Sequence, residues 1–417
     1  MYLIPISVPF RRTGEQVWEV ASDWAKSLLL LRDSFGGRFG PITVAAPEVV
    51  GASPLLDEQV PVAIRAEDDI RFEHLGLSTW RSRDFWGSFR EVRRTLDRLA
   101  PAAEVVHGSI NHLWQPYALM GFHAGLRARK ATVFVLDLDD VQRIRDMGRG
   151  SGILRRARDE VYCLAFVREA RVAVARADLS LLKGRQLHER YGRWARNARD
   201  FFDTSYHVGD VIPAADLARK VAAVRSGGPV RCLSLGRLVG YKGLDHTIRA
   251  VVAAARDGAD VTLDLIGDGP QRPELEALVR SLGAEGRIRF LGSRTYGTEL
   301  MREVAAYHLL LFTSRAEETP RSLFDAMAGG SALLAFDIPF TRQVAAEMGH
   351  GAVVPVGDDA ALAARIAGCA RDRGQLVAWM EAAAERAPHH AAEVWYRRRA
   401  EWTIEAWERH RRAPSGT

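Results

Sequence analysis

The sequence predicts an α/β protein in which two parallel sheets follow one another along the chain. Short apolar runs alternate with amphipathic helical stretches in both halves, and residues 209–229, which contain two prolines and a Gly-Gly pair, separate the halves. Alternating strands and helices form parallel sheets joined by crossover helices. We therefore expect an N-terminal domain over residues 1–208, a linker over 209–229 and a C-terminal domain over 230–387.

The first half contains six short apolar runs that we interpret as strands. Helical stretches lie between them, so these strands should pair in parallel. The runs cover residues 2–6, 42–45, 70–74, 104–107, 132–136 and 178–182.

The first apolar run of the second half, residues 230–236, leads into a glycine-punctuated loop. Arg237 and Lys242 lie on this loop, ahead of an amphipathic helix expected over residues 244–256. Glycine lets the backbone approach an anion closely, while Arg offers a bidentate fork and Lys a point charge. Two cations at the carboxyl end of a strand suit a diphosphate, although a solvated basic loop would show the same pattern.

A second segment of this half combines two acids with a helix start. An apolar run ends near Ser314, Glu317 follows on a loop, and Pro320 stands where the first turn of a helix over residues 321–328 would begin. Amides at a helix start point toward an anion. Asp325, inside this helix, should reach the same crevice as Glu317, and a carboxylate can accept two hydrogen bonds from the vicinal hydroxyls of a sugar or ribose. Solvated surface acids are the alternative.

Composition and motif spacing exclude several other classes. With 417 residues, 47 % hydrophobic and 26 % charged, the chain has the make-up of an ordinary globular protein. No run reaches the roughly 18 apolar residues of a membrane span, and no secretory signal precedes the first strand, so we expect a cytoplasmic protein. The GDGP turn at residues 267–270 lacks the third glycine of a dinucleotide-binding fingerprint.

Neither a disulfide framework nor a metal site is predicted. Cys163, Cys232 and Cys369 lie far apart in apolar contexts, which is typical of buried free thiols. The acidic run at residues 137–140 follows an apolar strand, and we interpret it as the start of a loop or a helix cap. No His/Cys cluster has the spacing of a zinc site.

Together these motifs resemble the retaining glycosyltransferase family four. The match covers about residues 230–356, where the family's GRL…KG, GDGP, E-x7-E and closing D…R elements correspond to residues 236–243, 267–270, Glu317 with Asp325, and Asp337 with Arg342. The family has Glu where this chain has Asp325. The resemblance implies two Rossmann-like domains facing a central cleft (the GT-B architecture), with residues 388–417 forming a helix that crosses back to the first domain.

The resemblance also implies an activity. A sugar would move from a nucleotide diphosphate, with UDP or GDP as the nucleotide, to a hydroxyl acceptor in polysaccharide, glycolipid or glycosylated-metabolite biosynthesis, without a metal or cofactor. Arg237 and Lys242 would neutralise the diphosphate, and Glu317 would contact the sugar. The other implied donor contacts are Asp325 to the ribose, Arg289 near the base, Gly236, and the backbone of Arg321, Ser322 and Leu323 to the diphosphate.

In the first half, the resemblance implies one further donor contact and the acceptor side. Gly14, on the loop after the first strand, would be the turn before a helix that faces the phosphates. The acceptor side would include His107, Ser109, Asn111 and His112, although Ser109 stands where relatives have a second histidine. A packed, hydrogen-bonded histidine is the alternative for His107.

The charge balance suggests an acidic partner. The net charge is +6 and the isoelectric point is near 9.4. Residues 80–100 mix Trp, Phe and Arg, so they could form a basic amphipathic helix on anionic lipid at the inner face of the cell membrane, next to a lipid-linked saccharide. An aromatic face packed in the core is the alternative. Nucleic acid is disfavoured because lysine is scarce and no recognition motif is present.

Three other functions share these features. A nucleotide-sugar epimerase or a sugar phosphorylase could use the same fold. A non-catalytic partner subunit could retain donor binding alone.

Overall fold

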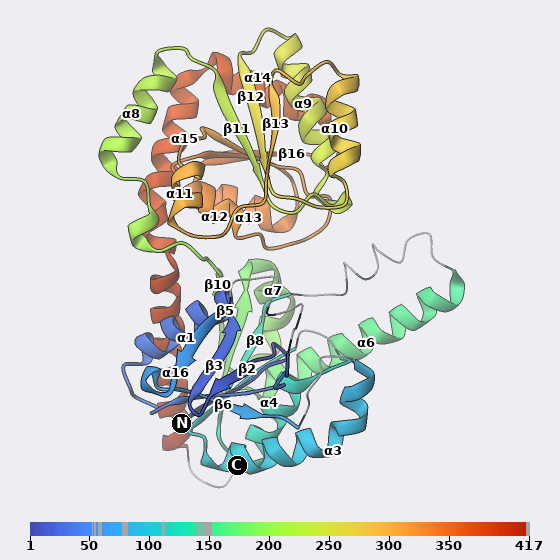
Figure 1. The fold of residues 1–417 in the computed structure, drawn as a ribbon, viewed down its shortest axis with the longest axis vertical. Helices are drawn as coiled ribbons and strands as arrows, with labels where there is room; N and C mark the ends of the chain where they lie inside the picture. The colour runs from blue at the N-terminus through green and yellow to red at the C-terminus, as the bar shows by residue number, and fades with distance from the viewer. Residues whose placement is uncertain are drawn as a thin grey trace. The chain divides into compact units, whose positions relative to one another are not determined.

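The computed structural model describes residues 1–51, 53, 56, 61–76, 82–110, 113–138, 141, 144 and 152–413. The chain divides into two compact units. The first contains residues Met1–Phe201 and Trp395–Thr417, and the second contains Phe202–Val394 (Figure 1). Within the described ranges, no helix is both long and apolar enough to cross a membrane.

The first unit is built on a sheet of seven parallel strands. Its order is β10-β9-β8-β7-β1-β4-β6. Six of these strands match the predicted apolar runs, and β10, with the sequence ARDF, was not predicted. The strands are β1 (Tyr2–Pro5), β4 (Ile42–Ala46), β6 (Ile70–His74), β7 (Val105–Ser109), β8 (Ala131–Leu136), β9 (Leu179–Lys183) and β10 (Ala198–Phe201).

A small antiparallel sheet in the first unit was not predicted. It contains β2 (Arg11–Gly14), β3 (Val17–Ala21) and β5 (Pro61–Arg65). Gly14 pairs with Val17 in the β2–β3 hairpin, so a strand and not a helix follows it. The expectation that Gly14 is the turn before a phosphate-facing helix is therefore wrong.

Helices flank the large sheet of the first unit. They are α1 (Ser22–Phe35), α3 (Ser82–Leu99), α4 (Tyr117–Arg127), α6 (Ile153–Arg176), α7 (Gly184–Tyr191) and α16 (Ala392–Arg412), whose residues from Trp395 onward belong to this unit. The predicted basic amphipathic helix is α3. Its apolar residues Phe85, Val92 and Leu96 are buried in the core, which is the alternative stated above.

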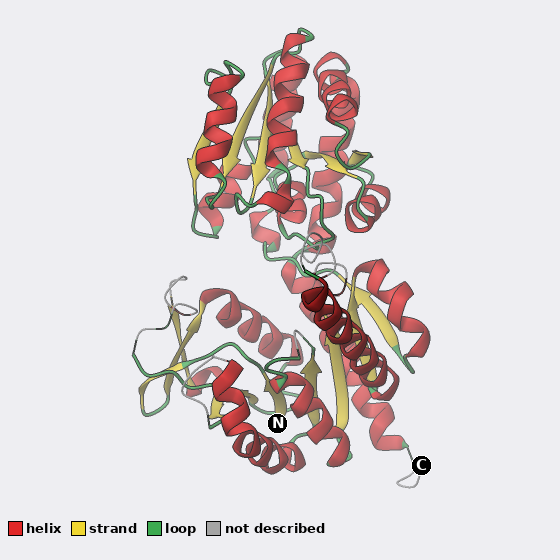
Figure 2. Ribbon diagram, turned by 90° about the vertical axis from the view of Figure 1, so that its right-hand side faces the viewer, coloured by secondary structure: helices red, strands yellow, loops and turns green. Residues whose placement is uncertain are grey.

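The second unit is built on six parallel strands in the order β13-β12-β11-β14-β15-β16. Helices cover both faces of this sheet (Figures 1 and 2). The strands are β11 (Val230–Leu235), β12 (Val261–Ile266), β13 (Ile288–Gly292), β14 (Leu309–Phe312), β15 (Ala332–Phe336) and β16 (Gly351–Val354). Because both faces are covered, the strands are nearly continuous apolar runs.

The helices of the second unit include the two that the sequence predicted beside the site. The helix over 244–256 is confirmed as α9 (Leu244–Arg256), and the helix over 321–328 begins one residue later, as α12 (Ser322–Ala328). The others are α8 (Ala214–Arg225), α10 (Arg272–Ser281), α11 (Thr298–Val304), α13 (Pro339–Met348), α14 (Asp359–Arg371) and α15 (Arg373–Arg386).

The segment 209–229 is not an open linker. It contains α8, and the Ile212 amide just before this helix donates a 2.8 Å hydrogen bond to the Ala328 carbonyl oxygen. The division between the units lies instead at Phe201–Phe202 and again at Val394–Trp395. Residues 209–229 therefore belong to the second unit.

The three cysteines are free and buried, as predicted. Burial raises the pKa of Cys369 to about 11 and that of Cys232 still further. These thiols therefore stay protonated and act as small apolar side chains.

Candidate functional site

The loop between β11 and α9 is held against the carboxyl end of β14. Gly243 has φ +62°, and a Cβ atom there would lie 2.4 Å from the Thr313 carbonyl oxygen. The Thr313 hydroxyl meets the Gly243 carbonyl oxygen at 2.9 Å and the Thr247 hydroxyl at 2.7 Å. Only glycine permits this close approach, so the sequence GYKG fixes where Lys242 lies.

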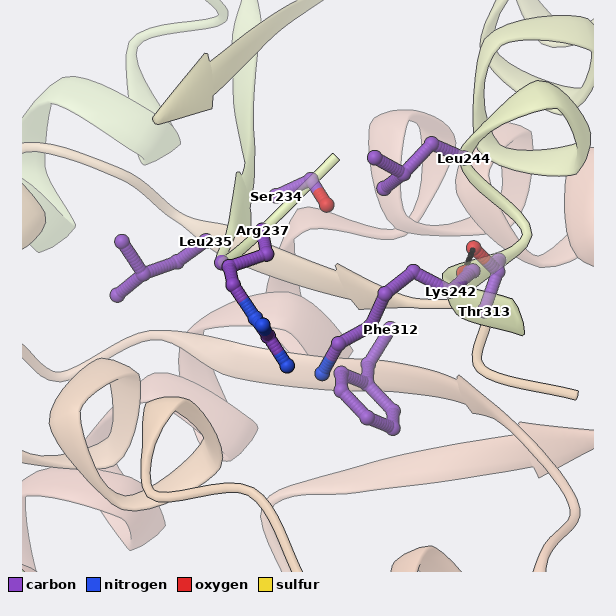
Figure 3. A pocket seen from close by; sticks show the side chains of 8 residues that line it. Ser234, Leu235, Arg237, Lys242, Leu244, Phe312 and Thr313 are labelled. Carbon is purple, nitrogen blue, oxygen red and sulfur yellow. Dashed lines mark hydrogen bonds between the residues drawn. The ribbon is translucent and has the colours of Figure 1, made fainter. Parts of the chain in front are cut away.

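This loop forms one wall of a small hollow of about 240 Å³, part of which is open to solvent. The side chains of Arg237 and Lys242 point into the same space, above the ring of Phe312 (Figure 3). Arg237 is exposed, and no described residue forms an ion pair with it. The sequence predicted that these two cations lie together at the carboxyl edge of the sheet, and they do. The hollow is lined by Ser234, Leu235, Gly236, Arg237, Lys242, Leu244, Phe312 and Thr313.

Lys242 has a partner that sequence reasoning missed. Its ammonium group lies 2.5 Å from Oε2 of Glu318, and the two side chains are only 14 % and 18 % exposed. The ammonium group also lies 5.3 Å from the centre of the Phe312 ring. The positive charge of Lys242 is thus balanced by Glu318, while that of Arg237 is not.

Glu317, next in the chain, is in the opposite situation. Both of its carboxylate oxygens are buried, and neither accepts a hydrogen bond from the part of the chain that the structure describes. Burial raises the pKa of Glu317 to about 7, and the nearby Glu318 adds to this. The Phe340 amide and Arg342 lower the pKa of Glu317, although the amide does not have the geometry of a hydrogen bond to the carboxylate. A buried acid without a partner usually has a functional or ligand-binding reason.

Asp325 is more enclosed than the sequence suggested. It is 4 % exposed, and its carboxylate accepts a 2.9 Å hydrogen bond from the hydroxyl of Tyr296. Burial raises the pKa of Asp325 to about 7, whereas the Tyr296 hydrogen bond and Arg321 lower it. Its role as a ribose contact stays a prediction.

The start of α12 is arranged by an ion pair. Arg321 precedes the helix and donates from Nε and Nη2 to one Asp203 oxygen, at 3.2 and 2.9 Å. Ser322 is the first helical residue, and the Leu323 side chain is buried. The predicted contact of their backbone with a diphosphate is left as a prediction.

Arg289 does not lie where the sequence suggested. It is the second residue of β13, and its guanidinium makes a bidentate pair with Asp264 of β12, at 2.7 and 2.6 Å. Gly292 ends this strand three positions later, roughly 10 Å away at the usual strand rise. The expected place of Arg289 at the strand end is therefore wrong, and its contact with a base stays a prediction.

The GDGP turn has a packing role. A Cβ atom on Gly267 would lie 1.9 Å from the Gly236 carbonyl oxygen, and one on Gly269 would lie 2.5 Å from that of Leu238. The Leu238 amide also donates to the Asp268 carbonyl oxygen at 2.9 Å. The turn after β12 therefore packs directly on the loop that carries Arg237.

In the first unit, His107 is a packed residue. Its Nδ1 atom lies 2.9 Å from the hydroxyl of Tyr2 on the neighbouring strand. Burial lowers the pKa of His107 to about 3, and Arg399 adds to this, so its ring is neutral at physiological pH. Ser109 is the last residue of β7. Asn111 and His112 lie outside the described residues, and the acceptor role of all four stays a prediction.

Within the described ranges, no group of three His, Cys, Asp or Glu residues could hold a metal ion. Asp139 and Asp140, half of the acidic run noted above, lie outside those ranges.

A buried lysine was also missed. Lys220 of α8 is 8 % exposed and donates to the carbonyl oxygens of Gly329 and Gly330, at 2.8 and 3.0 Å, just beyond the end of α12. Burial lowers the pKa of Lys220 to about 7. A signal was present, because Lys220 occupies an apolar position of the helix, three residues after Leu217 and four before Val224.

A known protein family matches much of the second unit. Residues 219–386 match the model of glycosyl transferases group 1, so this unit carries a domain of that kind.

Two curated relatives match part of the chain. Over 181 residues the chain is 30 % identical to a 2-deoxystreptamine glucosyltransferase of Streptomyces kanamyceticus, covering 42 % of this chain and 46 % of that protein. Over 151 residues it is 26 % identical to the GtfA subunit of a UDP-N-acetylglucosamine–peptide N-acetylglucosaminyltransferase of Limosilactobacillus reuteri subsp. suis, covering 36 % and 29 %. The chain thus spans less than half the length of these relatives.

Solved structures resemble nearly the whole chain. Anabaena HepE in complex with UDP has a TM-score of 0.65 at 17 % identity, covering 97 % of this chain and 99 % of that one. WaaG, a glycosyltransferase involved in lipopolysaccharide biosynthesis, has a TM-score of 0.60 at 15 % identity, covering 96 % and 99 %. At these identities the likeness concerns the fold, and it confirms two Rossmann-like α/β units with parallel sheets.

Proposed function

We propose that the chain is a retaining glycosyltransferase that moves a sugar from a UDP-sugar to a hydroxyl acceptor. The observation that carries this proposal is the hollow at the carboxyl edge of the second sheet, where Arg237 and Lys242 meet. Glu317, whose buried carboxylate has no hydrogen-bond partner among the described residues, directly precedes Glu318, the partner of Lys242. The glycosyl transferases group 1 match over residues 219–386 supports it. The choice of UDP is supported by HepE, which was solved with UDP and with UDP-glucose.

The two cations would stabilise the leaving nucleotide. The bond between the anomeric carbon and the β-phosphate oxygen breaks, and UDP leaves with the electron pair. The acceptor oxygen bonds to the anomeric carbon from the face that UDP leaves, and its proton passes to the departing phosphate oxygen. Arg237 and Lys242 then lower the barrier because they lie where negative charge develops.

The two neighbouring glutamates would have different tasks. Glu317 would accept hydrogen bonds from donor-sugar hydroxyls, which would give its two buried oxygens the partners that they lack. Glu318 forms an ion pair with Lys242 while no nucleotide sugar is bound, and the diphosphate would displace Glu318 from this pair. Binding of the nucleotide sugar would thus give Lys242 the diphosphate as a new anionic partner, and it would give Glu317 sugar hydroxyls as hydrogen-bond donors.

The biosynthetic setting is also part of the proposal. We place the acceptor hydroxyl on a saccharide, a glycolipid or a small metabolite. One of the curated relatives is named a 2-deoxystreptamine glucosyltransferase, and another is named a lipopolysaccharide core biosynthesis glycosyltransferase.

Nucleotide binding is tested first. Thermal unfolding is measured with UDP, GDP, ADP, CMP and dTDP on the wild type, on Arg237→Ala and on a control, Arg302→Ala, which removes an exposed arginine from α11. UDP at about a hundred times its dissociation constant should add roughly 2.7 kcal/mol of stability. The wild type and the control should show this gain, and Arg237→Ala should lose it. An equal gain in all three proteins would contradict the assigned phosphate site.

Catalysis is tested separately. UDP release from UDP-glucose, with and without hydroxyl acceptors, should be abolished by Glu317→Ala. Binding of UDP without any release or transfer would favour the non-catalytic subunit. Visible absorbance of a bound pyridoxal phosphate would favour a phosphorylase instead, and a change of configuration in the unbroken nucleotide sugar would favour an epimerase.

A further inference from the structure

Helix α6 has an apolar stripe on the side that faces away from the core. Ile153 and Leu154 are 84 % and 88 % exposed, and Val161 and Leu164 are 66 % and 63 % exposed. These four residues are called the outer stripe below. Ten large hydrophobic residues are exposed in the described part of the chain, and the outer stripe accounts for four of them. Exposed apolar side chains that cluster in this way usually mark an interaction surface.

The outer stripe is distinct from the packed face of the same helix. Residues 154, 161 and 164 repeat at intervals of seven and three, so they lie on one side of α6, and exposed Ala157 fills the gap between them. The buried residues Cys163, Phe166, Ala170, Ala173 and Val174 form the opposite side. Figure 1 shows the amino-terminal half of α6 extending beyond the sheet of the first unit.

Arginine dominates the charge around the outer stripe. Three arginines and two acids lie between residues 153 and 164, the span of the outer stripe, and Arg155, Arg156 and Arg158 are all exposed within the first two turns. Of the two acids, Asp159 lies 2.9 Å from Arg158 and 3.7 Å from Arg155, and Glu160 is the next residue along the chain. The surface is therefore apolar and net positive.

An exposed indole lies against the same helix. The Trp114 side chain is 53 % exposed, and its ring stacks on that of Tyr162 of α6, with 5.8 Å between the ring centres. Tryptophan with one side packed and the other exposed is typical of the boundary between headgroups and acyl chains.

We propose that the outer stripe of α6 docks the protein on an anionic lipid surface. Apolar side chains of the stripe would enter the acyl boundary, and the arginines would contact lipid phosphates. A second copy of the chain fits less well, because pairing two outer stripes would bring the arginines of both helices together. The proposal replaces the predicted contact through α3, whose apolar face is buried. It does not depend on the proposed sugar transfer.

The test is sedimentation of the full-length protein with vesicles at low and high salt. One set of vesicles is phosphatidylcholine alone, and the other is an equal mixture of phosphatidylcholine and phosphatidylglycerol. We expect binding to the mixed vesicles, weaker binding to phosphatidylcholine, and release by salt. The double variant Leu154→Glu with Val161→Glu should weaken binding by roughly tenfold or more, since it removes two inserted side chains and adds two negative charges.

The control is Val50→Glu, which changes an equally exposed apolar residue elsewhere in the first unit, 88 % exposed. It should bind like the wild type, and all variants should keep their melting temperature because the changed side chains contact solvent. Equal vesicle binding by the wild type and the double variant overturns the proposal, as does no binding at all. A dimer in sedimentation velocity that the double variant abolishes, without vesicle binding, would identify the stripe as a contact between copies and also overturn it.

Discussion

Replacing Glu317 by glutamine should stabilise the free protein at alkaline pH. The carboxyl group of Glu317 has no hydrogen-bond partner among the described residues, and burial raises its pKa from 4.5 to about 7. The folded protein therefore holds this proton up to a higher pH than the unfolded chain does. The stability that the neutral Glu317 side chain contributes is fully present below the pKa of this group in the unfolded chain. It falls as pH rises and is lost above the folded-state pKa of about 7.

The size of the effect follows from that pKa difference. A rise from 4.5 to about 7 corresponds to about 3 kcal/mol of destabilisation at alkaline pH. Glutamine has the shape of the neutral acid and no charge, so Glu317→Gln should recover most of this cost. For a unit of this size, 1 kcal/mol shifts the melting temperature by roughly 2–4 °C. We expect a gain of several degrees at about pH 8.5 that disappears near about pH 5.

The matched control is Glu318→Gln, one residue along the chain. This change removes the charge that lies 2.5 Å from the Lys242 ammonium group in a site only 14–18 % exposed. It should lower the melting temperature at about pH 8.5, because a partly buried cation loses its partner. Calorimetric scans of the three proteins across pH provide the measurement. A Glu317→Gln variant that melts below the wild type at alkaline pH would refute the reasoning.

Two further predictions concern the frame of the site. Gly243→Ala should cost about 1–3 kcal/mol and weaken the UDP-induced thermal shift, because a Cβ atom would meet the Thr313 carbonyl oxygen at 2.4 Å. Gly258→Ala, with φ +82° but open space around it, should cost only about 1 kcal/mol and leave the shift intact. Asp264→Asn should lower the free energy of unfolding by about 1–3 kcal/mol, because it weakens the pair with Arg289, yet keep the UDP shift. Loss of the UDP-induced thermal shift in Asp264→Asn would indicate that Arg289 contributes to donor binding.

Much of the fold could be predicted because parallel strands are buried on both faces. Such strands appear in the sequence as short continuous apolar runs, and β4 and β6 were predicted to within one residue. Of the strands that were missed, β3 (VWEVA) and β5 (PVAIR) belong to the small antiparallel sheet and mix apolar with charged residues, whereas β2 and β10 lack an apolar run. β2 has the sequence RRTG and β10 has ARDF, and both carry charges because each lies at the edge of its sheet.

The linker was misjudged because helix boundaries and linkers use the same residues. Pro213 precedes α8, and Gly227, with φ +90°, follows its end. These are the positions where proline and glycine commonly begin and end a helix. The buried Lys220 and the apolar residues around it were the better signal, since an open linker has no buried face.

The site could be predicted only where one continuous segment builds it. Arg237 and Lys242 lie on a single loop whose glycines fix its path, so their meeting could be inferred from spacing. The partners of Arg289, Asp325 and Lys242 come from other strands and loops. Which of them meet depends on strand register and packing, which spacing in the sequence does not reveal.

The pairing of Lys242 with Glu318 connects stability and binding at this site. While no anion is bound, Glu318 keeps a partly buried ammonium group balanced, and this contact stabilises the free protein. Under the proposed function, a diphosphate gains its contact with Lys242 only after that ion pair breaks, so the net free energy of binding is smaller than the contact alone would give. The Glu318→Gln variant should therefore melt at a lower temperature when free and yet bind UDP more tightly by calorimetric titration. Unchanged or weaker UDP binding by this variant would show that the diphosphate does not compete with Glu318 for Lys242.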